Sequence, residues 1–311
     1  MNLPVYIGKS EYCYANSAAM LLASAGYTVP PGTIEVLTGM GVGAAWIEAS
    51  DALLFSLSTP DVGLTRAFEA LGYSVQETAQ STSDRDPIPG LVAALADGPV
   101  IVGPLSLGLL PYNPYTRGEQ GADHYTLAYA ADVDHIVLHD PWGFPCIRMS
   151  VEDLRRAWAA PDIEYKRGYY RSWRQPKQME RPSPHDLVDR AIGVFRVVYS
   201  DAETLVQMTG VAIGADALHR VAQRYREGQM SAEGREFLIG FSLPLAARRA
   251  LDHVLFLNPY HPELAKTLTA KASLMGLCQT LLVANDAAFA DALDRTADNE
   301  TTFRNILGKL R

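Results

Sequence analysis

In the first half of the chain, hydrophobic positions follow helical spacing in some segments and strand spacing in others. Helices are expected over residues 16–25, 61–72 and 91–96. The second of these places apolar side chains three and four positions apart, as an amphipathic helix does, at Leu64, Ala67, Phe68 and Leu71. Gly26 directly follows the first helix, where a glycine commonly forms a left-handed C-terminal cap.

Strand patterns follow these helices. Residues 99–103 form a short apolar run, and residues 124–130 and 135–140 alternate on either side of a short turn, which predicts a hairpin. Ser150 is expected to be the N-cap of a further helix. Helices followed by strands indicate an α+β fold class, not the regular βαβ alternation of a doubly wound sheet.

The second half of the chain is almost entirely helical in pattern. Residues 174–184 contain three prolines and many polar side chains, and are interpreted as a linker. Alanine, leucine and valine then recur at spacings of three and four over 186–199, 203–227, 235–257, 262–284 and 286–308. Pro244 should kink or break the third of these segments. The expected organisation is therefore a mixed domain over 1–175 and an all-helical domain over 185–311.

Composition and charge narrow the possible roles. The 311 residues are 48% hydrophobic and carry a net charge of −8, which argues against nucleic acid as the main partner. No apolar run reaches the roughly 18 to 20 residues that span a membrane, and no secretory signal is recognisable, so no membrane association is expected. Three cysteines are too few for a disulfide framework. A cytoplasmic, reducing location is the simplest expectation.

One segment departs from this acidic balance. Residues 148–181 hold nine basic and five acidic residues, with Tyr165, Tyr169, Tyr170 and Trp173 interleaved. Such a segment is either a solvated connection between domains or a surface that docks an acidic protein or a phosphate-bearing arm.

Three residues in a fixed order are candidates for nucleophilic catalysis: Cys13, His124 and Asp140. Cys13 lies at or just before the start of a helix, where partial positive charge favours a thiolate and backbone N–H groups can stabilise an oxyanion. Adjacent antiparallel strands can bring His124 and Asp140 together, so that the imidazole acts as base and the carboxylate orients it.

Other residues of the same types receive structural interpretations. Cys146 and Cys278 are expected to be small buried hydrophobic residues. His135 and His139 would lie on one face of their strand, and Asp140 would lie on the other face. This arrangement favours His124 as the partner of Asp140. No Cys-x-x-Cys spacing occurs, and the glycine-rich stretch 39–43 is interpreted as a backbone turn that can flank a cleft. Neither a metal nor a cofactor is expected.

The connection over residues 104–122 is long and rich in proline, tyrosine and glycine. Connections of this length are often functional, but an ordinary surface loop is the alternative. If the loop is functional, an acceptor pocket would be lined by Tyr112, Tyr115, Arg117 and Glu119.

The pattern as a whole resembles the N-terminal domain of the butirosin-biosynthesis (BtrH-type) acyltransferase family, and more distantly the papain-like bacteriocin-processing cysteine peptidases. The resemblance covers roughly residues 5–160. It rests on the helix after Cys13, the glycine turn 39–43, Gly98 to Gly103, Leu110-Pro111-Tyr112, Asp123-His124-Tyr125, and Asp140-Pro141 ahead of a Ser-x-Glu-Asp-Leu helix.

This resemblance implies a papain-like α+β catalytic domain with Cys13 as nucleophile, His124 as base and Asp140 as orienting acid. It also implies an acyl group donated by a carrier-protein or coenzyme A thioester and accepted by an amine of a small molecule, in specialised metabolism.

The sequence departs from the peptidases at one position. Their oxyanion-hole glutamine lies about six residues before the cysteine, where this chain has Ile7. Ser10, Tyr6 and Asn16 are the alternative donors, and the choice among them stays open. A cysteine peptidase or amidase, and a non-catalytic papain-like scaffolding module, are the two rival functions. A homodimer is compatible with the sequence.

Overall fold

A computed structural model describes residues 3–8, 12–209 and 211–310. Its contacts divide the chain into two units. The first unit comprises residues 1–34 and 60–181, and the second comprises residues 35–59 and 182–311. The division differs from a single split near residue 180, because residues 35–59 join the helices of the second unit. Helix α2 (Pro31–Thr38) contains the first boundary.

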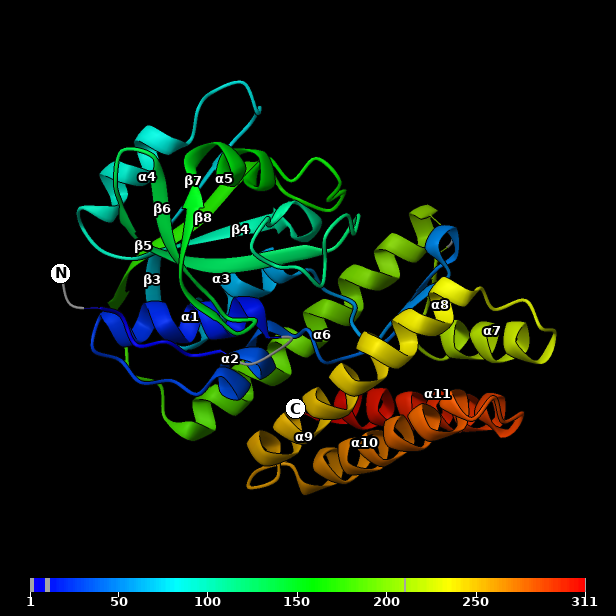
Figure 1. Cartoon of the computed structure of the whole chain (residues 1–311). Helices are drawn as coiled ribbons and strands as arrows, with labels where there is room; N and C mark the ends of the chain where they lie inside the picture. The colour runs from blue at the N-terminus through cyan, green and yellow to red at the C-terminus, as the bar shows by residue number, and fades with distance from the viewer. Residues whose placement is uncertain (1–2, 9–11, 210, 311) are drawn as a thin grey trace. The chain divides into compact units, whose positions relative to one another are not determined.

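The first unit is built on a six-stranded sheet whose paired neighbours are all antiparallel, in the order β3-β8-β4-β5-β6-β7 (Figure 1). The strands are β3 (Tyr73–Gln80), β4 (Val100–Ser106), β5 (Asp123–Ala131), β6 (His135–Asp140), β7 (Phe144–Ser150) and β8 (Tyr169–Gln178). β4 is buried along its whole length, as its continuous apolar run predicts.

Four helices cover this sheet, and a short 3-10 turn, η2 (Leu107–Leu109), follows β4. Figure 1 shows α1 (Cys13–Ser24) and α3 (Pro60–Ala70) on one side, with α4 (Ile88–Leu95) and α5 (Val151–Trp158) on the other. The Ala- and Leu-rich α1 packs mainly against β5, which carries His124. Its first ten residues are all buried, so the helix that begins at Cys13 is fixed in the core.

Most of the expected local structure in this unit is present. The three helices, the strand near residue 100 and the β5–β6 hairpin are all formed. Gly26 adopts φ +86°, as a left-handed cap requires. The Ser150 hydroxyl accepts a hydrogen bond from the Asp153 backbone N–H at 3.1 Å, which confirms the N-cap. The mixed α+β class is likewise confirmed.

The interpretation of residues 174–184 as a linker is wrong over its first part. Residues up to Gln178 belong to β8, which lies between β3 and β4 in the sheet. The strand is rich in arginine, glutamine and lysine, and these polar side chains obscured the buried positions Tyr170, Ser172 and Trp173. The first unit consequently runs to residue 181, beyond the expected limit at residue 175.

The second unit combines a small sheet with helices. Strands β1 (Ala45–Ile47), β2 (Ala52–Leu54) and β9 (Ala212–Ile213) pair in the order β2-β1-β9, with the 3-10 turn η1 (Glu48–Ser50) between the first two. The helices are α6 (Pro184–Thr209), α7 (Gly214–Arg226), α8 (Ala232–Phe237), α9 (Leu243–Leu257), α10 (Pro262–Val283) and α11 (Ala288–Lys309). A shared core includes Trp46, Leu53 and Phe55 together with residues of α7, α9, α10 and α11.

Two expected helix boundaries in this unit are wrong. The break expected between residues 199 and 203 is absent because α6 continues to Thr209, and the chain then forms β9 before α7 begins at Gly214. The helix is distorted near Pro244 but is not broken there. A π-helical segment, Leu238–Ser242, joins α8 directly to α9, and the backbone keeps helical angles at Phe237, Ser242 and Leu243.

The turn over residues 39–43 is a packed element of the second unit. A Cβ at Gly39 would meet Val194 and Val198 at 2.9 Å, one at Gly41 would meet the His253 ring at 2.3 Å, and one at Gly43 would meet Leu57 at 2.2 Å. The glycines therefore let this backbone approach its neighbours closely.

Within the described ranges, none of the helices combines the length and the apolarity that crossing a bilayer requires.

Candidate functional site

Cys13 is the first residue of α1, so its side chain lies where the helix presents unpaired backbone N–H groups. The residue is buried, with 8% of its surface exposed. The sulfur is hydrogen-bonded to the His124 imidazole and to the backbone N–H of Tyr125. The helix start, the cysteine and the first residues of β5 thus meet at one point.

His124 and Asp140 form the second contact of the site. His124 Nε2 lies 2.8 Å from Asp140 Oδ1, and both side chains are buried. In the β5–β6 ladder Leu127 faces His139, so His124 and Asp140 are offset along the strands and meet diagonally. Because Nε2 faces the carboxylate, Nδ1 is the ring nitrogen left for the Cys13 sulfur.

Further groups fix the Asp140 carboxylate. The backbone N–H of Trp142 donates to Oδ1 at 2.7 Å, and the Tyr112 hydroxyl donates to Oδ2 at 2.8 Å. The Trp142 ring also lies 6.0 Å from the His124 ring, measured between centroids. With three polar partners, the carboxylate is held in one orientation, as a residue that orients a base must be.

The charges of the site are mutually dependent. Burial opposes the charged form of His124, but the Asp140 carboxylate and Cys13 outweigh it and raise the pKa of the imidazole well above 6.5. Burial likewise opposes the charged form of Asp140, yet His124, the Trp142 N–H and Tyr112 lower its pKa. Burial raises the pKa of the Cys13 thiol, and the contact with His124 works in the opposite direction.

The four further candidates behave differently. Ser10 lies outside the described residues. Asn16 is one turn along α1 from Cys13, with 4% exposed surface, and its buried side-chain nitrogen has no hydrogen-bond partner. The Tyr112 hydroxyl donates to Asp140, so this side chain contacts the triad. Tyr115 is 82% exposed and is not brought to the triad.

Tyr6, the other oxyanion alternative, is engaged elsewhere. Its hydroxyl donates to the Asp140 backbone carbonyl at 2.8 Å and accepts from the Gly143 N–H at 3.0 Å. It therefore fastens the N-terminal segment to the turn after Asp140.

The rival histidines lie away from the site. His139 Nε2 contacts the Pro4 carbonyl at 3.1 Å, while its Nδ1 accepts from the Cys146 N–H at 3.2 Å. His135 pairs with Asp132 in the exposed β5–β6 turn.

Of the two cysteines expected to be buried, one is and one is not. Cys278 lies in the core of the second unit with no exposed surface, as predicted. The prediction for Cys146 is wrong, because this residue is exposed. It lies in the edge strand β7, where alternate side chains face solvent.

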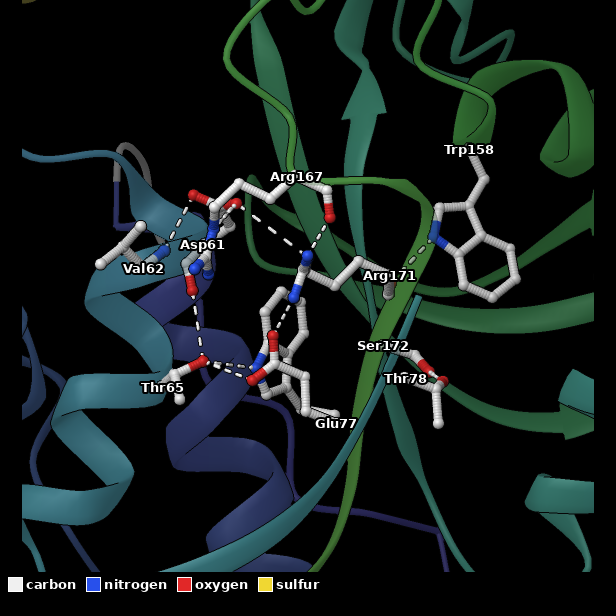
Figure 2. A network of polar contacts seen from close by, with 10 residues as sticks. Asp61, Val62, Thr65, Glu77, Thr78, Trp158, Arg167, Arg171 and Ser172 are labelled. Carbon is white, nitrogen blue, oxygen red and sulfur yellow. Dashed lines mark hydrogen bonds and ion pairs between the residues drawn. The ribbon is translucent and has the colours of Figure 1, made fainter. Parts of the chain in front are cut away.

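Much of the basic segment 148–181 is neutralised within the first unit. Figure 2 shows Asp61 and Glu77 facing Arg167 and Arg171. Arg167 Nε lies 2.9 Å from Asp61, and Arg171 pairs with Glu77. Arg155 pairs in the same way with Asp86. These ion pairs support an internal structural role for much of the excess charge, and they weaken its interpretation as a docking surface.

Sequence reasoning missed several groups at the site. The Trp142 N–H follows Asp140 by two residues, a spacing at which an aspartate commonly accepts from the backbone. Asp123, Tyr125 and Tyr165 also affect the charges around Cys13. Only the position of Asp123 and Tyr125 beside His124 could have indicated their importance. Across the described parts of the chain, no group of three or more His, Cys, Asp or Glu residues is arranged to hold a metal ion.

Comparison with known proteins gives two matches. The model of the YobF C-terminal domain family matches residues 207–308. Uncharacterized protein YobF of Bacillus subtilis (strain 168) is 35% identical over 307 residues, which cover 98% of this chain and 99% of that protein. The second match extends over both units. The chain therefore belongs to the YobF family.

Proposed function

We propose that this protein is a cysteine-dependent acyltransferase with a papain-like catalytic unit. The observation that carries the proposal is the continuous contact from the Cys13 sulfur through His124 to Asp140, with the sulfur at the N-terminus of a buried helix. A nucleophile, a base and an orienting carboxylate in contact are the arrangement that acyl transfer through a covalent intermediate requires.

In the proposed first half-reaction, the Cys13 sulfur attacks the carbonyl carbon of a donor thioester on a carrier protein or coenzyme A. The bond from that carbon to the donor sulfur breaks, and the departing thiolate takes a proton from the His124 imidazolium. The raised pKa of His124 suits this step, because the imidazole holds a proton that it can give. The product is an acyl group on Cys13.

In the second half-reaction, an amine of a small molecule attacks the acyl carbon. The nitrogen gives a proton to His124, the bond to Cys13 breaks, and the thiolate–imidazolium pair is restored. Asp140 keeps the imidazole in one orientation through both steps.

We assign the oxyanion contact to the backbone N–H at Cys13 and the side-chain amide of Asn16. Residues three apart lie on the same helix face, so Asn16 is close to Cys13 along α1. Its side-chain nitrogen is a buried donor without a partner, and such groups usually have a role.

The decisive experiment is the intact mass of the protein after incubation with a panel of acyl-pantetheine and acyl-coenzyme A thioesters. The expected result is a mass gain equal to the acyl group, absent in Cys13→Ala and discharged faster by amines than by water. Cys278→Ala is the matched control, because it removes a buried cysteine outside the site and should leave the adduct intact.

Two outcomes would contradict the transferase. Discharge by water as fast as by amines would indicate a hydrolase. Failure of every donor, with Cys13 resistant to alkylation, would indicate the second candidate, a non-catalytic scaffolding module. That candidate is favoured by one observation: the Cys13 thiol is buried and its pKa is raised.

A further inference from the structure

Next to the nucleophile lies a second polar cluster that the acyl-transfer chemistry does not use. It consists of Asp123, Tyr125 and Tyr165, all in the first unit. Asp123 begins β5 and directly precedes His124, and it faces Ser106 across the β4–β5 ladder. Tyr165 lies in the connection between α5 and β8. The cluster therefore shares a strand end with the catalytic histidine.

The two hydroxyls of this cluster are incompletely satisfied. Tyr125 has no exposed surface, and neither its hydroxyl nor that of Tyr165 makes a hydrogen bond of normal geometry. Each is close enough to the other, and Tyr165 to Asp123, for the groups to affect each other's pKa. Buried hydroxyls without full partners are costly, and they are commonly completed by a ligand or water.

The charge of Asp123 is also uncompensated. The nearby Asp61 accepts from the Val62 N–H at 2.8 Å and from Arg167 Nε at 2.9 Å, so its charge is balanced (Figure 2). Within the described ranges, no lysine or arginine pairs with Asp123 in this way. The cation that acts on it is His124, whose Nε2 is already held by Asp140. Burial raises the pKa of Asp123, with a smaller contribution from Asp61, and it outweighs the opposite effects of Tyr165 and His124.

We propose that Asp123, with the hydroxyls of Tyr125 and Tyr165, binds a protonated primary amine beside Cys13. A carboxylate and two hydroxyls are three acceptor groups, one for each N–H donor of an ammonium group. Asp123 as a whole residue is half-buried, whereas the hydroxyl oxygens of Tyr125 and Tyr165 are buried. This site rests on the proposed function only in assigning its occupant to the acyl acceptor, whose ammonium group gives one proton to the Asp123 carboxylate and then attacks the acyl carbon as the neutral amine.

The site would also couple ligand binding to the nucleophile. The Asp123 carboxylate disfavours the Cys13 thiolate, in addition to the larger effect of burial. An ammonium group bound to Asp123 would cancel that influence. Cys13 would then become more reactive when the cation is present, and Asp123 would act as a specificity-determining residue.

The test uses the butylammonium ion as a probe, with 1-butanol as its neutral counterpart. The backbone amide signals of His124 and Tyr125 are followed by NMR during titration of the full-length protein. Butylammonium should shift both signals saturably, whereas 1-butanol should not. In Asp123→Asn the response should be lost, and in Tyr165→Phe it should be weakened. Asp134→Asn removes an exposed carboxylate from the β5–β6 turn and should respond like the wild type.

A second readout is the rate at which iodoacetamide alkylates Cys13 at fixed pH. Saturating butylammonium should raise this rate roughly threefold to tenfold in the wild type, since a pKa shift of about half a unit to one unit changes the thiolate fraction by that factor. Asp123→Asn should be faster without the cation and should not respond to it.

The proposal would be overturned if Asp123→Asn responded like the wild type, or if no saturable shift appeared in the wild type. These results are separable from a failure of the acyltransferase. A cation response without any acyl adduct would leave the amine site in place and remove the transferase. An acyl adduct without a cation response would support the transferase and remove the amine site.

Discussion

Asp140 is the residue on which most contacts of the candidate site converge. Its two carboxylate oxygens contact His124, the Trp142 N–H and the Tyr112 hydroxyl, and its backbone carbonyl accepts from Tyr6. The carboxylate is buried, so no water molecule can easily replace these contacts if the side chain changes. Substitution of Asp140 should therefore affect both the chemistry of the site and its stability.

Asp140→Asn should retain the fold and lose most of the rate of Cys13 acylation. The neutral amide cannot favour the charged imidazole, so the pKa of His124 should fall toward or below its ordinary value. A loss on the order of 10³-fold to 10⁴-fold is expected, by analogy with the same change in other triads. The acylation rate and an NMR titration of His124 measure the two effects. Unchanged titration of His124 would contradict the role assigned to Asp140.

The same pair should make stability depend on pH. The pKa of Asp140 is lowered in the folded state, so its contribution is present above about 3.9 and is lost as the pH falls through the folded value. The pKa of His124 is raised, so its contribution is present below about 6.5 and is lost as the pH rises through the folded value. The destabilisation caused by Asp140→Asn, measured by urea unfolding, should be greatest between about pH 4 and 6.5. If Asp140→Asn lowered the free energy of unfolding by the same amount at every pH from 3 to 9, the ion pair between Asp140 and His124 would be contradicted.

Tyr112 provides a milder test of how firmly Asp140 is held. Tyr112→Phe removes one hydrogen bond to the carboxylate and should lower the acylation rate roughly tenfold to 100-fold. Tyr115→Phe is the matched control in the same loop, because its side chain is 82% exposed and should be neutral. Equal effects of the two substitutions would show that the Tyr112 contact has no special role.

At the scale of elements, the glycine turn 39–43 is held by close contacts with the second unit. Gly41→Ala would place a Cβ 2.3 Å from the His253 ring, which is fully buried and cannot move away. We expect destabilisation of about 1–3 kcal/mol in urea unfolding.

Gly193→Ala is the control for that substitution. Gly193 lies exposed within α6, and a Cβ there meets no atom within 4 Å. Alanine should stabilise this helix position by about 0.5–1 kcal/mol, so the two substitutions should have opposite signs. Destabilisation by both would show that the effect at Gly41 is not specific to the turn.

Helices and strands with a regular hydrophobic pattern could be predicted from the sequence, and those without one could not. The helix after Cys13 and the β5–β6 hairpin have regular spacing and short connections, so both could be predicted. β8 could not, because its polar residues lie on a strand flanked on both sides by other strands, and their partners, such as Glu77 for Arg171, are distant in the sequence. Ion pairs between distant residues leave no local pattern.

The candidate site was predictable for a related reason. Cys13, His124 and Asp140 each lie at the end of a regular element, so the pattern that identifies the element also locates the residue. The cluster of Asp123, Tyr125 and Tyr165 could not be found in this way. Tyr165 lies in an irregular connection and approaches Asp123 only through the tertiary fold.

At the scale of the whole molecule, the second unit is assembled from two separate stretches of chain. Residues 35–59 supply β2 and β1, of which β1 pairs with β9, and they also supply Glu35, whose carboxylate lies 2.7 Å from the buried Arg249. Both the pairing of β1 with β9 and the ion pair between Glu35 and Arg249 need residues 35–59. The helices after residue 182 are therefore an incomplete unit.

A fragment of residues 182–311 should consequently fail to form a cooperative fold. It would leave Arg249 without Glu35, a change that typically costs about 3–5 kcal/mol for a buried pair, and it would expose the core surface covered by Trp46, Leu53 and Phe55. Circular dichroism and thermal unfolding measure the outcome. Joining residues 35–59 to the fragment through a flexible linker should restore a cooperative transition. A sharp transition in the fragment alone would contradict this account.

The interleaving of the two units also has a consequence for how such proteins can evolve. A single recombination point between two genes would separate residues 35–59 from the helices that enclose them, so a chimera of two divergent parents would inherit mismatched halves of one core. Exchange of either unit for an unrelated one is thereby disfavoured, and the two should descend together. The similarity to the Bacillus subtilis protein, which extends over 98% of this chain, fits such shared descent.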